Sequence, residues 1–322
     1  MADLSLVTGG AGFIGSHLVE ALVWDGKPVR VLDDFSTGLE SNLTPFRDAI
    51  EVIEGSVTDP AAVARAVRGA GVVYHLAALA SVARSVENPL ATHDACATGT
   101  LRVLDAARAA GARRVVYAAS SSAYGGSSSE AGQCEDQVPC ARSPYAAAKL
   151  AGELYLQAFT ASYGLETVRL RFFNIFGPRQ RADSPYSGVI ALFAAAMQDG
   201  NPPTIHGDGL QSRDFTYVTN AVQALRQAAQ APAVSGQVYN VGTGRSITIL
   251  DLVRELNRLL GTNLVPGHGP PRAGDVPFSR ADIRRTRRDL GYEPEVTFED
   301  GLERTLRYQE QAGRARLEKV RF

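Results

Sequence analysis

Cysteine, methionine and tryptophan are scarce in this chain of 322 residues, which contains three, two and one of them. The three cysteines, Cys96, Cys134 and Cys140, are odd in number and show no metal-site spacing, so we predict reduced thiols and no bound metal. No apolar run approaches the roughly 20 residues that a membrane helix requires. A strand pattern begins within a few residues of Met1, so we expect no signal peptide and a cytoplasmic protein.

An excess of charge of one sign is also missing. The chain has 33 lysines and arginines against 34 aspartates and glutamates, which gives a formal net charge of −1. Such a balance produces no strong field for nucleic acid or an anionic membrane, so we predict neither as a partner. The length suits two domains, or one large α/β unit with an appendage.

Short apolar runs alternate with helical patterns in the first half of the chain. The patterns predict helices at 13–26 and 100–112, and strands at 4–10, 29–34, 50–59, 72–78, 113–121 and 165–177. This alternation predicts an α/β protein with a doubly wound parallel sheet and helices on both faces. After about Gly177, long loops rich in proline, glycine and serine appear, and such loops are often functional.

The segment TGGAGFIGSH places Gly9, Gly12 and Gly15 between a predicted strand and a predicted helix. Small residues let the backbone turn tightly and approach a pyrophosphate, and the helix N-terminus offers amide donors. Asp33 ends the next predicted strand, where a carboxylate can accept hydrogen bonds from both hydroxyls of an adenosine ribose. Because this carboxylate would repel a 2′-phosphate, the pattern predicts a Rossmann site for NAD rather than NADP.

A second motif, SPYAAAKLAGE, carries Tyr145 and Lys149 near the start of a predicted helix. Ser143 can cap that helix and Pro144 suits its first position. Tyr145 and Lys149 are then at positions i and i+4, on the same helical face. The commoner interpretation of this spacing is a core tyrosine beside a surface lysine. A nearby ammonium can also lower the pKa of a tyrosine, which would let Tyr145 accept a proton from a substrate.

Together, the glycine triad, Asp33, HLAA at 75–78 and the Tyr145–Lys149 pair resemble the extended short-chain dehydrogenase/reductase family over Leu4 to about Leu306. Within that family the sequence is similar to the NAD-dependent nucleotide-sugar 4-epimerases. The resemblance implies an NAD-binding Rossmann domain at 1–176, joined by a returning helix and strand at about 217–243. It further implies a smaller C-terminal α/β lobe at 177–322 that binds a UDP-sugar, and a homodimer built on helices near 91–110 and 144–163.

The resemblance also implies a set of cofactor contacts. Ser56 stands where an aspartate usually contacts adenine, and Cys96 replaces a usual asparagine, so both positions depart from the family pattern. Asp34 could contact the cofactor or be solvated. The implied cofactor-binding residues are Gly9, Gly12, Phe13, Ile14, Gly15, Asp33, Asp34, Thr37, Gly38, Ser56, Val57, Leu76, Ala77, Ala78, Tyr145, Lys149 and Phe172.

The resemblance assigns catalysis to Tyr145, Lys149 and Ser120. Tyr145 would take the proton of the sugar 4-hydroxyl, and Lys149 would lower the tyrosine pKa and bind the nicotinamide ribose. Ser120 would hydrogen-bond the same hydroxyl, with Ser121 and Ser122 as alternatives because three serines follow one another. No acidic residue follows the serines, which disfavours dehydratase and decarboxylase chemistry.

Several loop residues resemble the family's UDP-sugar contacts. Arg213 and Arg272 match pyrophosphate-binding arginines, which suit phosphate through their planar donors, and Asp275 matches the carboxylate that binds the UMP ribose. Asn174 matches a sugar-contacting asparagine and argues against a uronic acid substrate. Val189, Thr204 and His206 fall at the family's uracil pocket, although His206 could equally be an exposed loop histidine.

Ser279 aligns with a gate near the sugar C2 substituent, where a tyrosine restricts the pocket to plain hexoses and a small residue leaves room for an N-acetyl group. The resemblance therefore implies reversible epimerisation of UDP-N-acetylglucosamine to UDP-N-acetylgalactosamine. A UDP-glucose 4-epimerase or a dual-specificity enzyme is the nearest alternative, and a UDP-glucuronate 4-epimerase or a non-catalytic NAD-binding regulator are others. The implied substrate-binding residues are Ala80, Ser81, Ser120, Ser121, Tyr145, Asn174, Gln180, Gly188, Val189, Thr204, His206, Arg213, Arg272, Asp275 and Ser279.

Overall fold

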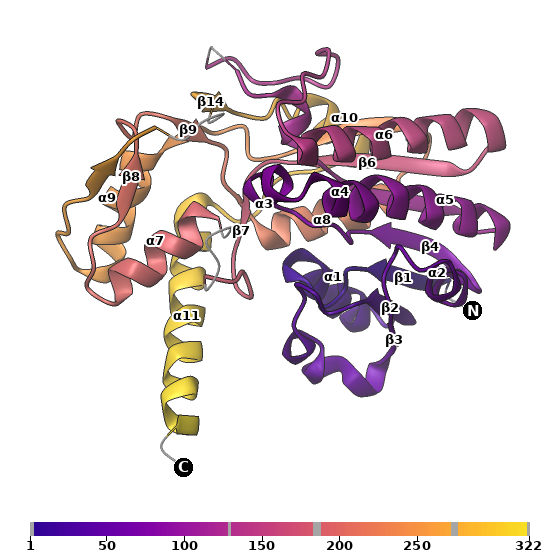
Figure 1. The fold of residues 1–322 in the computed structure, drawn as a ribbon, viewed down its shortest axis with the longest axis horizontal. Helices are drawn as coiled ribbons and strands as arrows, with labels where there is room; N and C mark the ends of the chain where they lie inside the picture. Colours follow the sequence, from indigo (N-terminus) through magenta and orange to yellow (C-terminus); the bar gives the residue numbers. More distant parts are fainter. Residues whose placement is uncertain (1–2, 128–129, 183–187, 272–275, 321–322) are drawn as a thin grey trace.

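The computed structural model describes residues 3–127, 130–182, 188–271 and 276–320, the last eight of them by their backbone alone. Its centre is a seven-stranded parallel sheet with the strand order β11-β6-β5-β4-β1-β2-β3 (Figure 1). The predicted doubly wound parallel sheet is therefore confirmed. The strands are β1 (Leu4–Thr8), β2 (Val29–Asp33), β3 (Ile50–Glu54), β4 (Ala70–His75), β5 (Arg114–Ser120), β6 (Glu166–Phe172) and β11 (Gln237–Val241).

Helices cover both faces of this sheet because its strands alternate apolar residues between the two sides. Val7 and Val116 pack in one apolar core with α1 (Phe13–Trp24) and α8 (Val218–Gln230). Leu6 and Val115 pack in the other, with helices α2 (Pro60–Val67), α5 (Gly99–Ala109) and α6 (Pro144–Tyr163).

Helix α6 begins where the sequence predicts. The Ser143 hydroxyl accepts a hydrogen bond from the Ala146 amide at 3.1 Å, Pro144 occupies the first turn, and Gly164 ends the helix with φ of +71°. The predicted strand at 165–177 is shorter than expected and divides into β6 and β7 (Ile175–Phe176). Asn174 causes this break because its φ of +34° is incompatible with continuous strand geometry.

A second group of elements surrounds its own apolar core, which includes Phe176, Phe215, Leu252 and Phe298. The helices of this lobe are α7 (Val189–Gln198), α9 (Ile249–Leu260) and α11 (Phe298–Val320), and α11 projects away from the rest of the chain (Figure 1). Its strands are β8 (Thr204–His206), β9 (Ser212–Arg213), β10 (Thr216–Tyr217), β12 (Ile247–Thr248), β13 (Gly267–Gly269) and β14 (Phe278–Ser279).

Short helical elements complete the fold. They are η1 (Glu40–Asn42), η2 (Thr44–Ala49), α3 (Val82–Glu87), α4 (Pro89–His93), the π-helical turn η3 (Asp94–Thr98), η4 (Ser121–Tyr124) and α10 (Arg284–Leu290). Within the described ranges, no helix combines the length and the apolar character that would let it span a bilayer.

Candidate active site

A cavity of about 720 Å³ lies at the carboxyl ends of the central strands, where open parallel sheets bind ligands. Residues at or just after the ends of β1, β2, β3, β4, β5 and β6 line it, together with the first turn of α1 and two residues of α6. Segments from the whole sheet therefore meet in one place.

The turn after β1 is shaped for close approach of a ligand. Gly9 has φ of +72°, and a Cβ atom added there would lie 2.8 Å from the Ala77 amide nitrogen. A Cβ atom at Gly15 would overlap the Gly9 carbonyl oxygen. Helix α1 starts directly after Gly12, and its first three residues line the cavity, where the amides of a helix N-terminus can bind an anion. This glycine turn fits a pyrophosphate.

Asp33 is held beside the glycine turn. Its Oδ2 accepts a hydrogen bond from the Ala11 amide at 2.8 Å, and its Oδ1 accepts one from the Phe35 amide at 2.9 Å. Burial raises the pKa of Asp33, whereas these amide bonds lower it. Each carboxylate oxygen has a further lone pair, so Asp33 can still accept hydrogen bonds from ribose hydroxyls. The glycine turn and Asp33 together fit NAD.

Most of the other predicted cofactor residues line the same cavity, namely Phe13, Ile14, Asp34, Thr37, Ser56, Val57, Leu76, Ala77, Ala78 and Phe172. Gly38 does not line it, and instead packs against Ala11 and Asp33. The Ser56 hydroxyl oxygen accepts hydrogen bonds from the amide and the hydroxyl of Thr58. Ser56 is thus held by its own turn while facing the cavity.

Ser120, Tyr145 and Lys149 converge on the cavity from β5 and α6. Among the three consecutive serines, Ser120 forms the side-chain hydrogen bond with Tyr145. The Ser122 hydroxyl donates a hydrogen bond to the Ser120 oxygen at 2.8 Å, so this second serine supports the first. Hydroxyl groups of Ser120 and Tyr145 can therefore contact one substrate oxygen.

Lys149 is buried among Tyr117, Tyr145, Cys96 and Glu153. Its Nζ lies 4.2 Å from the centre of the Tyr117 ring, which is a cation–π contact. Burial lowers the pKa of Lys149 to about 8, opposed by the charges of Cys96 and Glu153. The ammonium group is thus retained at neutral pH but loses its proton more readily than an exposed lysine.

Among the chain's own groups the pKa of Tyr145 is raised, so its expected lowering by Lys149 together with the NAD⁺ ring stays a prediction for the NAD-bound protein. Burial raises the pKa of Tyr145 and the nearby Cys96 raises it further, while only the Ser120 hydrogen bond lowers it. Desolvation outweighs this hydrogen bond, since the partly buried tyrosine ring packs between α6 and η3. Cys96 is fully buried and packs against Ala148 and Tyr145, and burial also raises the pKa of its thiol.

The structure brings together part of the predicted sugar site. Asn174, Gln180 and Gly188 line the cavity, as do Ala80 and Ser81. Among the described residues, six predicted substrate contacts lie outside its lining, with Ser121 beside the cavity in η4: Ser121, Val189, Thr204, His206, Arg213 and Ser279. Arg272 and Asp275 lie outside the described residues.

Arg213 and Ser279 form a unit of their own in the lobe. They are direct neighbours in the parallel pair β9–β14, and Arg213 Nη1 donates a hydrogen bond to the Val276 carbonyl oxygen at 2.8 Å. Ser127, a few residues after the serine run, forms an antiparallel bridge with Phe278. Strand β14 is therefore connected to the segment that follows the serine run.

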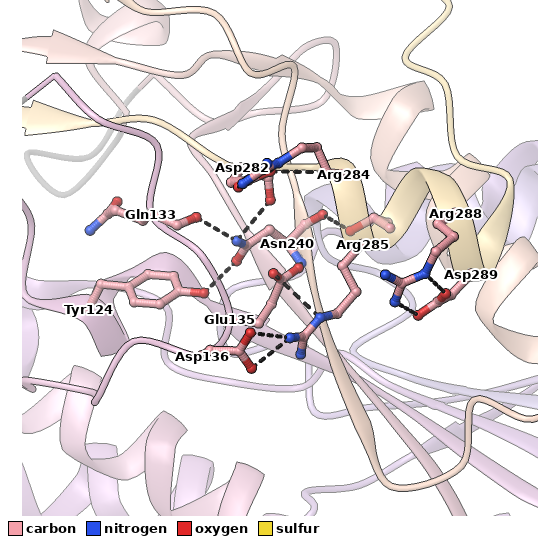
Figure 2. Close-up of polar contacts among 11 residues, drawn as sticks. Tyr124, Gln133, Glu135, Asp136, Asn240, Asp282, Arg284, Arg285, Arg288 and Asp289 are labelled. Carbon is pink, nitrogen blue, oxygen red and sulfur yellow. Dashed lines mark hydrogen bonds and ion pairs between the residues drawn. The ribbon is translucent and has the colours of Figure 1, made fainter.

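A buried polar network joins this region to the main sheet (Figure 2). The Asn240 amide nitrogen of β11 donates to Glu135, and its side-chain Nδ2 donates to the Gln133 carbonyl oxygen at 2.8 Å. Its Oδ1 accepts a hydrogen bond from the Tyr124 hydroxyl at 2.7 Å, two residues after the serine run. Asp282, three residues after Ser279, also accepts through its carbonyl oxygen. Asn240 thus connects β11 with Tyr124, with the loop at 133–135 and with Asp282.

The cavity has lining residues that the motifs do not identify. Arg84 lies one turn into α3, and its backbone amide donates a hydrogen bond to the Ser81 hydroxyl. Arg179 and Arg181 flank Gln180 in the loop GPRQR. The sequence signal for Arg179 and Arg181 is their position on either side of Gln180, a predicted substrate contact, in a loop that contains glycine and proline.

The fold and the site define an α/β protein with a dinucleotide cavity that carries a serine, a tyrosine and a lysine. The model of the NAD dependent epimerase/dehydratase family matches residues 5–242. The UDP-glucose 4-epimerase of Mycolicibacterium smegmatis is 37% identical over 307 residues, covering 94% of this chain and 97% of that protein.

Two solved structures are also similar. A UDP-N-acetylglucosamine 4-epimerase from Methanobrevibacter ruminantium has 36% identity and a TM-score of 0.92, covering 97% of this chain and 99% of that one. The UDP-glucose 4-epimerase of Thermus thermophilus, solved with NAD, has 35% identity and a TM-score of 0.88, covering 96% and 99%. The chain belongs to the NAD dependent epimerase/dehydratase family and is an NAD-dependent nucleotide-sugar epimerase.

Proposed function

We propose that the chain catalyses the reversible C4 epimerisation of UDP-N-acetylglucosamine to UDP-N-acetylgalactosamine. The observation that carries this proposal is the small, buried side chain of Ser279, which stands beside Arg213 on the β9–β14 pair. A serine at this gate leaves space for an N-acetyl group that a tyrosine would fill. The similar epimerase from Methanobrevibacter ruminantium, named for UDP-N-acetylglucosamine, supports the same choice.

UDP-glucose is the second candidate substrate, alone or together with the N-acetylated sugar. Two similar proteins are named UDP-glucose 4-epimerases, at 37% and 35% identity. An open gate does not reject a smaller sugar, because a pocket discriminates weakly against a ligand that merely lacks a group.

In this proposal the domain around the central sheet and the C-terminal lobe bind different ligands. Residues 1–176 with 217–243 would bind NAD, and the lobe at 177–322 would bind the UDP-sugar. The glycine turn would hold the pyrophosphate, Asp33 the adenosine ribose, and Lys149 the nicotinamide ribose. Bound NAD supplies reversible hydride uptake from the sugar C4 and the positive charge of its nicotinamide ring.

Tyr145 accepts the proton of the 4-hydroxyl in this mechanism, and Ser120 holds the same oxygen through its hydroxyl. The 4-keto sugar then turns within the site, and Tyr145 returns the proton after the opposite face of C4 is reduced. The reaction is redox-neutral, so no free NADH accumulates. Because Ser121 and Ala123 provide no carboxylate beside Ser120, dehydration and decarboxylation lack an acid–base group there.

An epimer assay tests the proposal. The purified protein is incubated with UDP-N-acetylglucosamine, with or without added NAD, and in parallel with UDP-glucose, and the C4 epimers are separated by chromatography. We expect UDP-N-acetylgalactosamine to form. Formation of UDP-galactose alone would contradict the substrate, and the absence of any epimer would contradict the proposed reaction.

A further inference from the structure

Helix α1 contacts the sugar side of the cavity as well as forming the dinucleotide turn. One turn beyond its start, His17 Nε2 lies 2.9 Å from the carbonyl oxygen of Pro178. Nearly one further turn along, the Glu20 carboxylate forms a 2.6 Å ion pair with Arg179. The paired side chains of Glu20 and Arg179 are less than one-fifth exposed, so solvent screens this ion pair only partly. These contacts join segments that are far apart in the sequence.

The segment held in this way is a wall of the cavity. Arg179, Gln180 and Arg181 all line it, and they follow β7 directly. Arg179 has φ of +65°, a left-handed conformation that residues other than glycine rarely adopt. A backbone in such a conformation persists only where surrounding contacts hold it. The contacts from His17 and Glu20 reach this turn from α1.

His17 is an uncharged donor in this arrangement. A carbonyl oxygen can only accept a hydrogen bond, so the His17 ring carries its proton on Nε2. Burial lowers the pKa of His17 to about 4; the Pro178 bond and the Glu20 charge oppose that shift, and the Arg179 charge adds to it. The His17 ring therefore stays neutral, with its proton on Nε2, across the neutral pH range.

The remainder of the first turn of α1 also packs toward the lobe. Phe13 and Ile14 line the cavity and pack against the lobe's apolar core, and the Phe13 ring meets the His17 ring edge-on with centroids 6.1 Å apart. Neither His17 nor Glu20 belongs to the glycine turn or lines the cavity. Their contacts serve the sugar-side loop instead.

We propose that His17 and Glu20 are positioning residues that fix the Pro178–Arg181 segment as the sugar-side wall of the cavity. The helix that begins at the pyrophosphate turn thereby sets the shape of the pocket that receives the sugar. This inference rests on the proposed function only in assuming that the cavity binds a nucleotide sugar, and it holds for either candidate sugar.

Kinetics of the NAD-loaded protein test the proposal, with whichever of UDP-N-acetylglucosamine and UDP-glucose the wild type converts. His17→Ala and Glu20→Gln each remove one contact, and we expect KM to rise about tenfold while kcat changes less than about threefold. His17→Gln retains an N–H donor that can reach the Pro178 carbonyl, so we expect its KM to return toward the wild-type value.

The matched control is Asp25→Asn, which removes another carboxylate from the end of α1. Asp25 pairs with Arg226 of α8 at 2.6 Å, away from the sugar-side loop, so its KM should match the wild type. Bound NAD and the thermal midpoint are measured for every variant. The proposal is overturned if KM rises equally in the control, or if kcat or bound NAD falls while KM is unchanged.

A wild type that converts neither sugar would refute the proposed function without deciding this inference. In that case binding of UDP-N-acetylglucosamine to the NAD-loaded protein is measured by calorimetry. A Kd about tenfold weaker in His17→Ala and Glu20→Gln than in Asp25→Asn supports the positioning role, and equal Kd values overturn it.

Discussion

Burial controls the protonation of the reacting side chains. Lys149 is buried and Tyr145 is partly buried in the cavity wall, and desolvation is the largest influence on the pKa of each. It lowers the pKa of the lysine and raises that of the tyrosine, so both groups favour their neutral forms more than they would in water. A positive charge brought close to Tyr145 is then needed to release its proton.

Removing the Tyr145 hydroxyl tests its role as the proton acceptor. In Tyr145→Phe we expect kcat to fall at least about a hundredfold, because the general base is lost while the ring and its packing remain. Epimer formation and bound NAD are measured together. Tyr155→Phe is the control, since Tyr155 lies on the same helix but is exposed. An equal loss of kcat in both variants would refute the assignment.

Ser279 tests substrate choice at a single position. Ser279→Tyr should lower kcat/KM for UDP-N-acetylglucosamine about tenfold or more relative to UDP-glucose, because the larger ring occupies the space proposed for the N-acetyl group. Both substrates are assayed in competition. A loss of the same size for both sugars would exclude the gate.

His75 makes the fold sensitive to acid. The ring is fully buried, Nδ1 lies 2.7 Å from the Thr8 hydroxyl oxygen, and Nε2 lies 2.9 Å from that of Thr100. Burial lowers its pKa from 6.5 to about 3, helped by the Lys149 charge. Between these two pH values His75 is protonated in the unfolded chain but neutral in the native state. The free energy of unfolding therefore falls as the pH is lowered.

The expected contribution is up to about 1.4 kcal/mol of unfolding free energy per pH unit between pH 6.5 and 3. His75→Gln should flatten the plot of unfolding free energy against pH in that window, measured by urea titration. His93→Gln on α4 is the control, since this histidine is exposed. An unchanged slope in His75→Gln would contradict the prediction.

At the scale of elements, the turn between β1 and α1 depends on residues without side chains. A Cβ atom at Gly15 would overlap the Gly9 carbonyl oxygen, a backbone atom that cannot move without opening the turn. Gly15→Ala should therefore lose most of its bound NAD, measured by release of the nucleotide from the purified protein.

A suitable control for that variant is Gly267→Ala. Gly267 lies in β13, where an added Cβ atom has only the Thr204 hydroxyl oxygen at 4.0 Å as a neighbour. Its NAD content should equal that of the wild type. If Gly15→Ala also kept its NAD, the turn would not be the pyrophosphate site.

The polar network around Asn240 shows a second role for elements. Asn240 of β11 accepts a hydrogen bond from Tyr124 of η4. It donates hydrogen bonds to the loop at 133–135 and to the segment after β14 (Figure 2). Buried amide groups are costly unless paired, so these partners must be in place together. The network thereby fixes the spacing between the serine run and the strand that carries Ser279.

At the scale of the whole molecule, helices α3, α4 and α6 present exposed apolar side chains. Val82, Val86, Leu90 and Leu154 are each at least half exposed, and Tyr155 lies next to Leu154. The three helices contact one another, and exposed apolar side chains on adjoining helices are typical of a protein interface. The resemblance implies a homodimer built on helices near 91–110 and 144–163, ranges that include α6 and the end of α4 but not α3. We propose that these exposed side chains form part of its interface.

Light scattering after gel filtration tests the dimer. The wild type should have twice the 34.3 kDa chain mass, and the double variant Leu90→Asp with Leu154→Asp should have the mass of one chain. Val265→Asp, a similarly exposed position in the lobe, should remain a dimer. A wild type of single-chain mass, or a double variant that stays dimeric, would contradict this interface.

Local sequence patterns were sufficient to predict the parallel sheet, the glycine turn, the position of Asp33 beside it and the start of α6. Each depends on residues a few positions apart, such as Ser143 and Pro144 at a helix start, so spacing in the chain already specifies the geometry. The serine run was ambiguous for the same reason, since neighbouring serines differ only in register.

The environment of these residues came from packing between distant segments. Spacing placed Tyr145 and Lys149 on one helical face, but their burial, with Cys96 and Tyr117 against the ammonium, required η3 and β5 to close over α6. The contacts of His17 and Glu20 with Pro178 and Arg179 likewise exist only once β7 lies beside α1. Desolvation and long-range contact depend on the folded neighbourhood of a residue, and for that reason no local pattern could reveal them.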